Sequence, residues 1–238
     1  MTNLGFIRRA LMLAASSALV ACGGGGGGPA PVVGPVASTS IFQFRDGWIN
    51  SVNLTSTQSF GVSGTLSGQA VTGSGTVTRG AVSNATFEGI AGLQKSSTVV
   101  ATIRSGSTSV PFTYTSTGFY GKDYIPLGIT TATTYSVVSG PVTMPTTVRV
   151  NDTAPLFTYK TYSSSAKIAL VETVSVSYVL LPDTANTALL KLTYVTKNAS
   201  GAQTSQSIVT LRMTPSGTVT PIDETGITST DNLTFTYL

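Results

Sequence analysis

The stretch that decides the fold class is residues 170–181, LVETVSVSYVLL. In its centre, V-S-V-S-Y, apolar and hydroxyl side chains alternate. Successive side chains of a β-strand point to opposite faces, so this period of two predicts a strand with one buried face. Pro182-Asp183 follows at once and is typical of a turn, so we expect the strand to end there.

The same alternation recurs along the chain, and turn residues such as Pro, Gly and Asn separate the alternating segments. Short strands joined in this way predict an antiparallel meander. No window shows a convincing apolar stripe of helical period. The strands that we expect are residues 41–49, 59–66, 70–78, 98–104, 109–115, 170–181, 189–195, 205–213 and 233–238.

The sequence therefore predicts an all-β fold, with antiparallel meander sheets that form a sandwich or barrel-like body in one or two lobes. Residues 126–147 are rich in Pro, Gly and Thr, and we interpret them as a linker between β domains at 41–125 and 148–238. The alternative is one continuous sheet that curls across both halves. A closed or sandwiched arrangement would protect the edges of so many strands.

Composition narrows the classes of protein. Charged residues make up 9% of the chain, against about 25% in an average domain, while hydrophobic residues make up 41%. Disordered chains show the reverse balance. The pI of about 9.3 owes part of its height to Arg8 and Arg9 near the N-terminus. The other basic residues are scattered singly, whereas nucleic-acid binding needs a clustered patch, so no nucleic-acid partner is expected.

Residues 1–21 have the parts of a secretory signal peptide. Arg8 and Arg9 precede a short apolar stretch that ends at Ala21. A stable membrane-spanning helix needs about 20 apolar residues, so we do not expect a permanent anchor here. The single cysteine of the chain, Cys22, follows immediately. An ordinary cleavage site would leave it as an unpaired thiol in an oxidising compartment.

The string Leu19-Val20-Ala21-Cys22 resembles the lipobox of bacterial lipoproteins. The resemblance implies that the Cys22 sulfur is alkylated by a diacylglyceryl group, that the peptide is cut before Cys22, and that the new amine is acylated. Several acyl chains give stable attachment to a bilayer. In this family a residue other than Asp after the cysteine, here Gly23, favours the outer membrane. We therefore expect a lipid-anchored protein in the outer membrane of a Gram-negative bacterium. The sequence does not specify whether the protein lies on the periplasmic face or on the cell surface.

Residues 22–40 follow as the lipidated cysteine and a Gly/Pro tether, because glycine runs are flexible and proline segments are extended. A phosphate-binding loop is not predicted, since no strand precedes the glycines and no Gly-Lys-Ser/Thr follows them. A transmembrane β-barrel would also fit alternating strands and an outer-membrane address. The lipid anchor makes such a span unnecessary, and the chain has one Trp for the aromatic girdles of such barrels.

The chain contains no histidine, which removes Ser-His-Asp and Cys-His catalysis. Ser164-Ser-Ala-Lys167 matches the S-x-x-K motif of penicillin-recognising enzymes, where lysine activates serine. The partner motifs Ser-Asp-Asn and Lys-Thr-Gly do not follow it, so we interpret the match as a coincidence in a serine-rich turn.

Isolated carboxylates leave two further possibilities. A pair of them could hydrolyse glycosides, with candidates at Glu88, Asp123, Asp152, Glu172 and Asp183. Others could bind calcium, but they lack the spacing of a calcium loop; these are Asp223, Glu224 and Asp231. We expect no catalytic residue, no metal and no cofactor.

Trp48, Tyr120 and Tyr124 could stack on sugar rings, although core packing is the commoner role of such residues. The sequence thus predicts a non-catalytic protein with a structural or interaction role in the cell envelope. Its partners would be the lipid bilayer, through acylated Cys22, and an envelope protein or glycan. The alternatives are a surface-exposed glycan- or protein-binding module and, less favoured, a carboxylate-dependent hydrolase.

Overall fold

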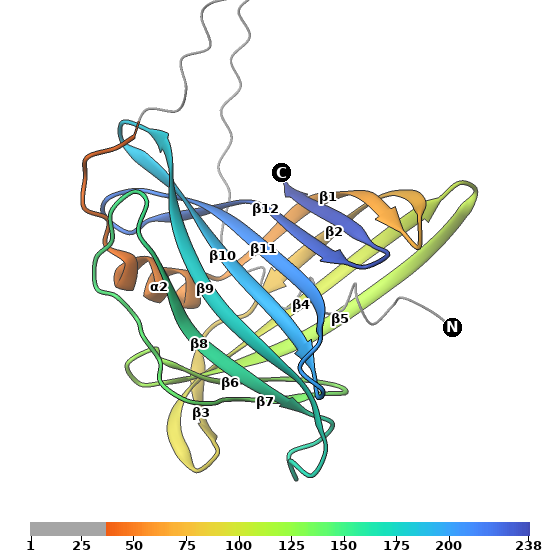
Figure 1. The fold of residues 1–238 in the computed structure, drawn as a ribbon, viewed down its shortest axis with the longest axis horizontal. Coiled ribbons are helices and arrows are strands. Elements are labelled where there is room, and N and C mark those ends of the chain that lie inside the picture. The colour runs from red at the N-terminus through yellow and green to blue at the C-terminus, as the bar shows by residue number, and fades with distance from the viewer. Residues whose placement is uncertain (1–36) are drawn as a thin grey trace, which may run out of the picture.

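A computed structural model describes residues 37–238 (Figure 1). The signal peptide, Cys22 and most of the tether lie outside the described residues. The described body is almost entirely β, which confirms the predicted fold class. Within residues 37–238 it has one helix, α2 (Phe44–Asn53), which precedes all the strands.

The strands run in the order β1 (Ser56–Leu66), β2 (Gln69–Arg79), β3 (Ser83–Phe87), β4 (Ile90–Ser105), β5 (Thr108–Gly121), β6 (Pro126–Thr131), β7 (Tyr135–Val138), β8 (Thr153–Tyr162), β9 (Leu170–Thr184), β10 (Thr187–Asn198), β11 (Gln203–Met213), β12 (Val219–Thr228) and β13 (Asn232–Tyr237).

These strands form a closed antiparallel barrel of 12 strands. Strands that are neighbours along the chain pair with one another, except β2 and β3; β13 returns to β1, and β2 pairs with β4. The long β4 makes this closure possible, because residues 90–94 pair with β3 and residues 97–104 pair with β2. β3 therefore lies outside the ring, as a flap on the start of β4.

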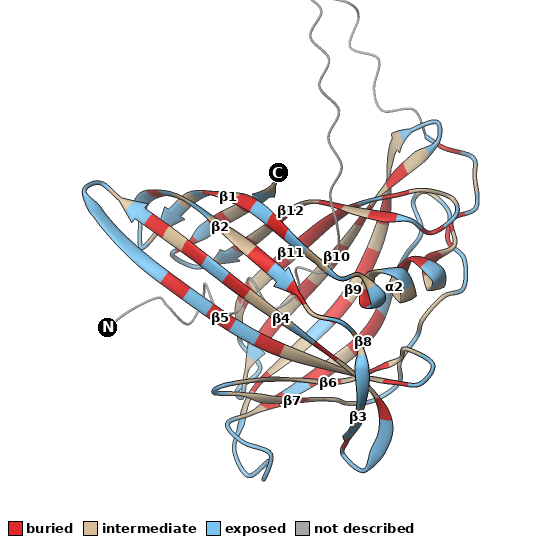
Figure 2. Cartoon of the chain, turned by 180° about the vertical axis from the view of Figure 1, so that it is seen from behind, coloured by how far each residue is buried: buried red, intermediate tan, exposed pale blue. Residues whose placement is uncertain are grey.

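Buried and exposed residues alternate along the strands, as Figure 2 shows for β4 and β5. In a closed barrel the buried positions face the interior. The outer positions of this wall carry many hydroxyl side chains, which bond to each other across the strands. Thr98 and Thr115 lie 3.1 Å apart (Oγ1 to Oγ1), as do the hydroxyl oxygens of Ser96 and Thr117. The barrel is thus apolar inside and rich in hydroxyls on this outer wall.

The interior holds two separate clusters of buried side chains. The helix-side cluster joins α2 to β8–β12, and its members include Phe44, Phe157, Tyr159, Leu190, Leu192, Tyr194 and Val209. The hairpin-side cluster joins β1, β2, β4, β5 and β13, and its members include Phe60, Val62, Val77, Val99, Ala101, Phe112 and Phe235.

The predicted strand at residues 41–49 is wrong, because most of it belongs to α2. The buried or inward positions of this helix are 44, 47, 48, 51 and 52, which is the spacing of one helical face. Two of them, Gly47 and Ser51, are too small to stand out as part of an apolar stripe. Phe42 instead forms an isolated bridge to Val148 just before the helix.

The other expected strands are confirmed, each inside an observed strand or overlapping it. The segment interpreted as a linker, residues 126–147, contributes β6 and β7 to the same sheet. Within residues 37–238, no helix is both long and apolar enough to cross a membrane.

Candidate functional site: an internal cavity beside helix α2

Helix α2 packs against the barrel at the turn between β11 and β12. Gly217 in this turn has a φ of +83°, which favours glycine. A Cβ atom at Gly217 would lie 2.7 Å from the Gln43 carbonyl oxygen and 2.9 Å from the Gly47 nitrogen. The backbone Gln43 N–H also donates to the Pro215 carbonyl over 3.0 Å. Because Gly47 and Gly217 have no side chains, the helix and the turn can approach each other closely.

The turn between β5 and β6 holds the opposite side of the helix. The Trp48 indole N–H donates to the Tyr124 carbonyl over 2.8 Å, and Arg45 donates to the Asp123 carbonyl. The Tyr124 hydroxyl donates to the Asn53 side chain over 3.2 Å. The indole ring of Trp48 is thus fixed in orientation, with its face directed into the barrel.

Lys95 caps the C-terminal end of α2. Its ammonium group donates to the Ser51 carbonyl over 3.2 Å and to the Leu54 carbonyl. The last carbonyl groups of a helix lack intrahelical partners and carry partial negative charge, so a cation is stabilised there. Lys95 is 5% exposed. Its burial, followed by repulsion from Arg79, lowers the pKa of Lys95 to about 8.

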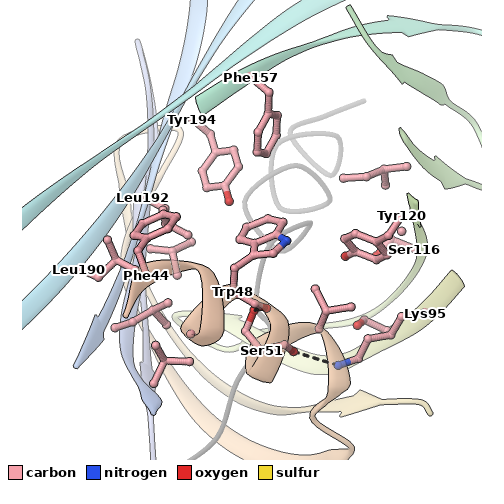
Figure 3. A pocket seen from close by; sticks show the side chains of 18 of the residues that line it. Phe44, Trp48, Ser51, Lys95, Ser116, Tyr120, Phe157, Leu190, Leu192 and Tyr194 are labelled. Atoms are coloured by element: carbon pink, nitrogen blue, oxygen red, sulfur yellow. Dashed lines mark hydrogen bonds between the residues drawn. The ribbon is translucent and has the colours of Figure 1, made fainter. Parts of the chain in front are cut away.

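A cavity of about 80 Å³ lies between α2 and the barrel wall (Figure 3). Trp48 stands at its centre, with ring centroids of Tyr120 and Phe157 6.5 and 6.1 Å away in edge-on arrangements. Leu190 and Leu192 line the side nearest β10, and Lys95 and Ser116 line the side nearest β4 and β5. The cavity thus has an aromatic and aliphatic side and a polar side.

Tyrosine hydroxyls face this cavity without a protein partner. Tyr120, Tyr159, Tyr194 and Ser116 line it, and none of their hydroxyls forms a hydrogen bond with another described residue. In Figure 3 the hydroxyls of Tyr120 and Tyr194 both point toward Trp48. Burial raises the pKa of Tyr120 to about 12 and raises the pKa values of Tyr159 and Tyr194 as well. All three phenols are therefore neutral at physiological pH and can donate.

A buried polar group lies between the two apolar clusters. Glu224 is fully buried on β12, between Val209 of one cluster and Phe235 of the other. Its Oε1 accepts a hydrogen bond from Ser207 over 3.1 Å, and its Oε2 has no partner in the described chain. Burial raises the pKa of Glu224 to about 8, against the opposing effects of Ser207 and Arg79. Glu224 therefore carries little negative charge at neutral pH.

The structure brings the three predicted aromatic residues together. Trp48 and Tyr120 line the cavity, and Tyr124 holds the indole of Trp48 through its backbone. Trp48 and Tyr120 thus pack edge-on against each other beside α2, while the Tyr124 hydroxyl donates to Asn53.

The S-x-x-K match does not form a nucleophile pair. The Lys167 amine forms an ion pair with Glu88, whose other oxygen accepts a hydrogen bond from the Tyr135 hydroxyl over 2.6 Å. Only the backbone links Lys167 to Ser164, through the Lys167 N–H and the Ser164 carbonyl. Hydrogen bonds from Lys167 and Tyr135 lower the pKa of Glu88. These residues join the flap β3 to β7 and to the loop after β8.

The other predicted carboxylates are spread over the barrel. Asp183 pairs with Arg212 over 2.7 Å, and Asp152 accepts a backbone N–H at the start of β8. Glu172 is buried on β9. Asp231 accepts the Ser67 N–H over 2.7 Å in the turn before β13, away from the interior position of Glu224. Within residues 37–238, no group of three acidic, cysteine or histidine residues has metal-binding geometry.

Three residues at the cavity were not expected from the sequence. Tyr194 lies on a strand whose alternation predicted burial but no site, Tyr159 lies on β8, which is not among the expected strands, and Lys95 lies next to a run of serines. One signal was available for Lys95, because it falls at an inward position of a strand that otherwise reads as small and apolar. A lysine at such a position needs a partner.

No protein-family model, no curated protein and no solved structure matches this chain.

Proposed function

We propose that this chain is a lipid-anchored envelope protein of the outer membrane whose barrel is a binding module for a small ligand. The anchor would be acylated Cys22. The ligand would occupy the cavity beside α2, enclosed by Trp48 and the tyrosine hydroxyls. This combines the predicted envelope role with the predicted binding module, and it moves the binding site from the outer surface to the interior.

The observation that carries the proposal is the set of hydroxyls without protein partners around the cavity. A hydroxyl group can both donate and accept a hydrogen bond. Tyr120, Tyr159, Tyr194 and Ser116 direct such groups toward one space. A ligand with polar atoms would satisfy them together, while its apolar part would contact Trp48 and the leucines.

The hydroxyl-rich outer wall supports an anchor by lipid. Thr98 and Thr115 bond to each other on the outside, whereas most apolar side chains of β4 and β5 face inward, with Val100 and Val110 as exposed exceptions. A body of this kind favours water around it, so membrane attachment falls to the acylated cysteine. Low surface charge with many hydroxyls is compatible with either face of the outer membrane.

Because Trp48 is the single tryptophan of the chain, its fluorescence reports on the cavity alone. We expect the full-length protein in detergent to change its emission when small probes are added, using butyrate, butyramide and 1-butanol. Ser116→Leu would fill the cavity and abolish the response. Thr115→Leu, on the outer face of the same strand, is the matched control and would leave it intact. If wild-type protein responds to no probe, ligand capture is refuted.

The anchor is tested separately by palmitate labelling and membrane fractionation. Cys22→Ala should lose the label and release the barrel from the membrane fraction. A variant that stays labelled and membrane-bound would contradict the lipid anchor. Protease treatment of intact and permeabilised cells then shows on which face of the outer membrane the barrel lies.

A further inference from the structure

Lys95 is a buried cation without a carboxylate partner. Its ammonium group contacts only carbonyl oxygens of Ser51 and Leu54, and no acidic side chain of the described chain lies within ion-pair distance. A lysine ammonium carries three donors, so one remains beyond these two contacts. Carbonyls at a helix end supply only about half a negative charge. The polar side of the cavity is therefore short of negative charge.

The neighbours of Lys95 on β4 and β5 line the same wall of the cavity. In the β4–β5 register Lys95 lies opposite Gly118, and Ser97 lies opposite Ser116. All four line the cavity. Cross-strand partners have Cβ atoms about 4.5–5.5 Å apart, so an ammonium and two hydroxyls are neighbours on one wall. Gly118 leaves this wall open, since a Cβ there would lie 2.8 Å from the Tyr120 hydroxyl oxygen.

No carboxylate of the described chain forms an ion pair with Lys95. Of the two buried glutamates, Glu172 lies on β9, and Glu224 on β12 has a pKa raised to about 8, which keeps it mainly protonated. Arg79, 1% exposed, adds a second buried cation whose repulsion reaches Lys95. Lys95 and Arg79 are thus both buried, while the carboxyl group of Glu224 is mainly protonated at neutral pH.

The volume limits the ligand's size. A volume of about 80 Å³ is about half of the roughly 150 Å³ that accepts benzene in an engineered cavity. A ligand of the size of benzoate is therefore too large without rearrangement. A chain of a few carbon atoms fits between Trp48 and Leu192.

Resting on the proposed function, we infer that the cavity binds a short-chain aliphatic monocarboxylate. The carboxylate accepts hydrogen bonds from Lys95, Ser97 and Ser116, and the alkyl chain packs against Trp48, Leu190 and Leu192. A charge-assisted hydrogen bond is about twice as strong as a neutral one, so the carboxylate is the main determinant of specificity.

The test is calorimetric titration of the full-length protein at pH 6.5, where butyrate is ionised and Lys95 is protonated. We expect butyrate to bind at least 10-fold more tightly than butyramide, 1-butanol or benzoate. Lys95→Met should lower butyrate affinity at least 10-fold and leave 1-butanol unchanged. Lys160→Met, exposed on β8, is the matched control and should bind as wild type does.

Two further measurements keep the result interpretable. Lys95→Arg retains the cation and should recover butyrate binding, which a variant that merely misfolds would not allow. Equal affinity for butyrate and its neutral analogues would overturn the carboxylate assignment while ligand capture stands. Tighter binding of benzoate than of butyrate would overturn the size limit. Absence of binding by every probe would refute both the inference and the proposed capture.

Discussion

In the hairpin-side cluster the strands approach so closely that glycine is required, whereas in the helix-side cluster they enclose a helix and still leave a cavity. A Cβ atom at Gly75 would lie 2.5 Å from the Val100 carbonyl and 2.6 Å from the Phe60 ring. Beside α2, by contrast, Trp48 and several large side chains border empty space. The same barrel thus has one region packed by its own strands and another region that retains a cavity.

This difference teaches where function can reside in such a barrel. Close packing maximises dispersion contacts and tolerates few changes. An incompletely filled region loses some of these contacts, and the proposed ligand site lies in such a region. The buried Glu224 lies between the two regions, so its protonation affects the boundary at which they meet.

The largest effect should come from emptying the tightly packed end. Phe60 is 1% exposed and makes edge-on contacts with the Phe235 and Tyr237 rings. Phe60→Ala should lower the free energy of unfolding by about 3–5 kcal/mol, as for other buried phenylalanines. Val100→Ala, on the exposed face of β4, should change it by less than about 0.5 kcal/mol. Urea denaturation measures both, and similar values would mean that this end is not well packed.

The position of Glu224 between the two clusters should make the stability of the barrel depend on pH. The pKa of Glu224 rises from 4.5 to about 8 on folding, so the folded state holds its proton more tightly than the unfolded chain. Its stabilising contribution is complete below about pH 4.5 and is lost as the pH rises through 8. Glu224→Gln stays neutral, so the variant should lack this loss and gain on the order of a few kcal/mol relative to wild type above pH 8.

Thermal melts between pH 5 and 9 measure this difference. Lys95 contributes with the opposite sign. Its pKa falls from 10.5 to about 8 on folding, so the destabilisation caused by its buried charge is lost as the pH rises from 8 to 10.5. A wild-type curve that ran parallel to the Glu224→Gln curve across the whole range would contradict the assigned pKa of Glu224.

Adding a methyl group at the tightly packed end should destabilise the barrel. The Cβ of Gly75→Ala would meet backbone and core atoms that cannot withdraw, so overpacking should cost about 1–3 kcal/mol. Gly61, on the neighbouring strand, has no atom within 4 Å of such a Cβ. Gly61→Ala is therefore the matched control, and equal losses for the two variants would show that space at Gly75 is not limiting.

Adding a methyl group beside α2 should stabilise the barrel instead, and this is the smallest of the expected effects. Ser116→Val removes a hydroxyl without a protein partner and adds a methyl group where space exists. Cavity filling with a β-branched residue in a strand should stabilise by about 0.5–1 kcal/mol. Denaturation in the absence of ligand provides the measurement. A loss of stability would mean that the hydroxyl of Ser116 is satisfied in the free protein.

The strands were predictable from the sequence because their information is local. Alternation in V-S-V-S-Y reports a half-buried strand whatever its neighbours are, and β9 to β11 and β13 confirm it. Helix α2 was missed because Gly47 and Ser51 break its apolar stripe, and both are small for the sake of contacts with distant segments. Gly47 meets the turn at Gly217, and the Ser51 carbonyl meets Lys95.

By itself the sequence determined the fold class and most of the strands, and it singled out Trp48 and Tyr120 among the aromatic residues of the cavity. It also carries the basis for the predicted anchor at Cys22. Only the tertiary structure decided that β2 pairs with β4, that α2 lies against the barrel wall, and that Lys95, Ser116 and three tyrosines share one cavity. The physical reason is range: periodicity and turn chemistry act between neighbours in the chain, whereas closure of the ring and the cavity within it depend on pairings between segments far apart in sequence.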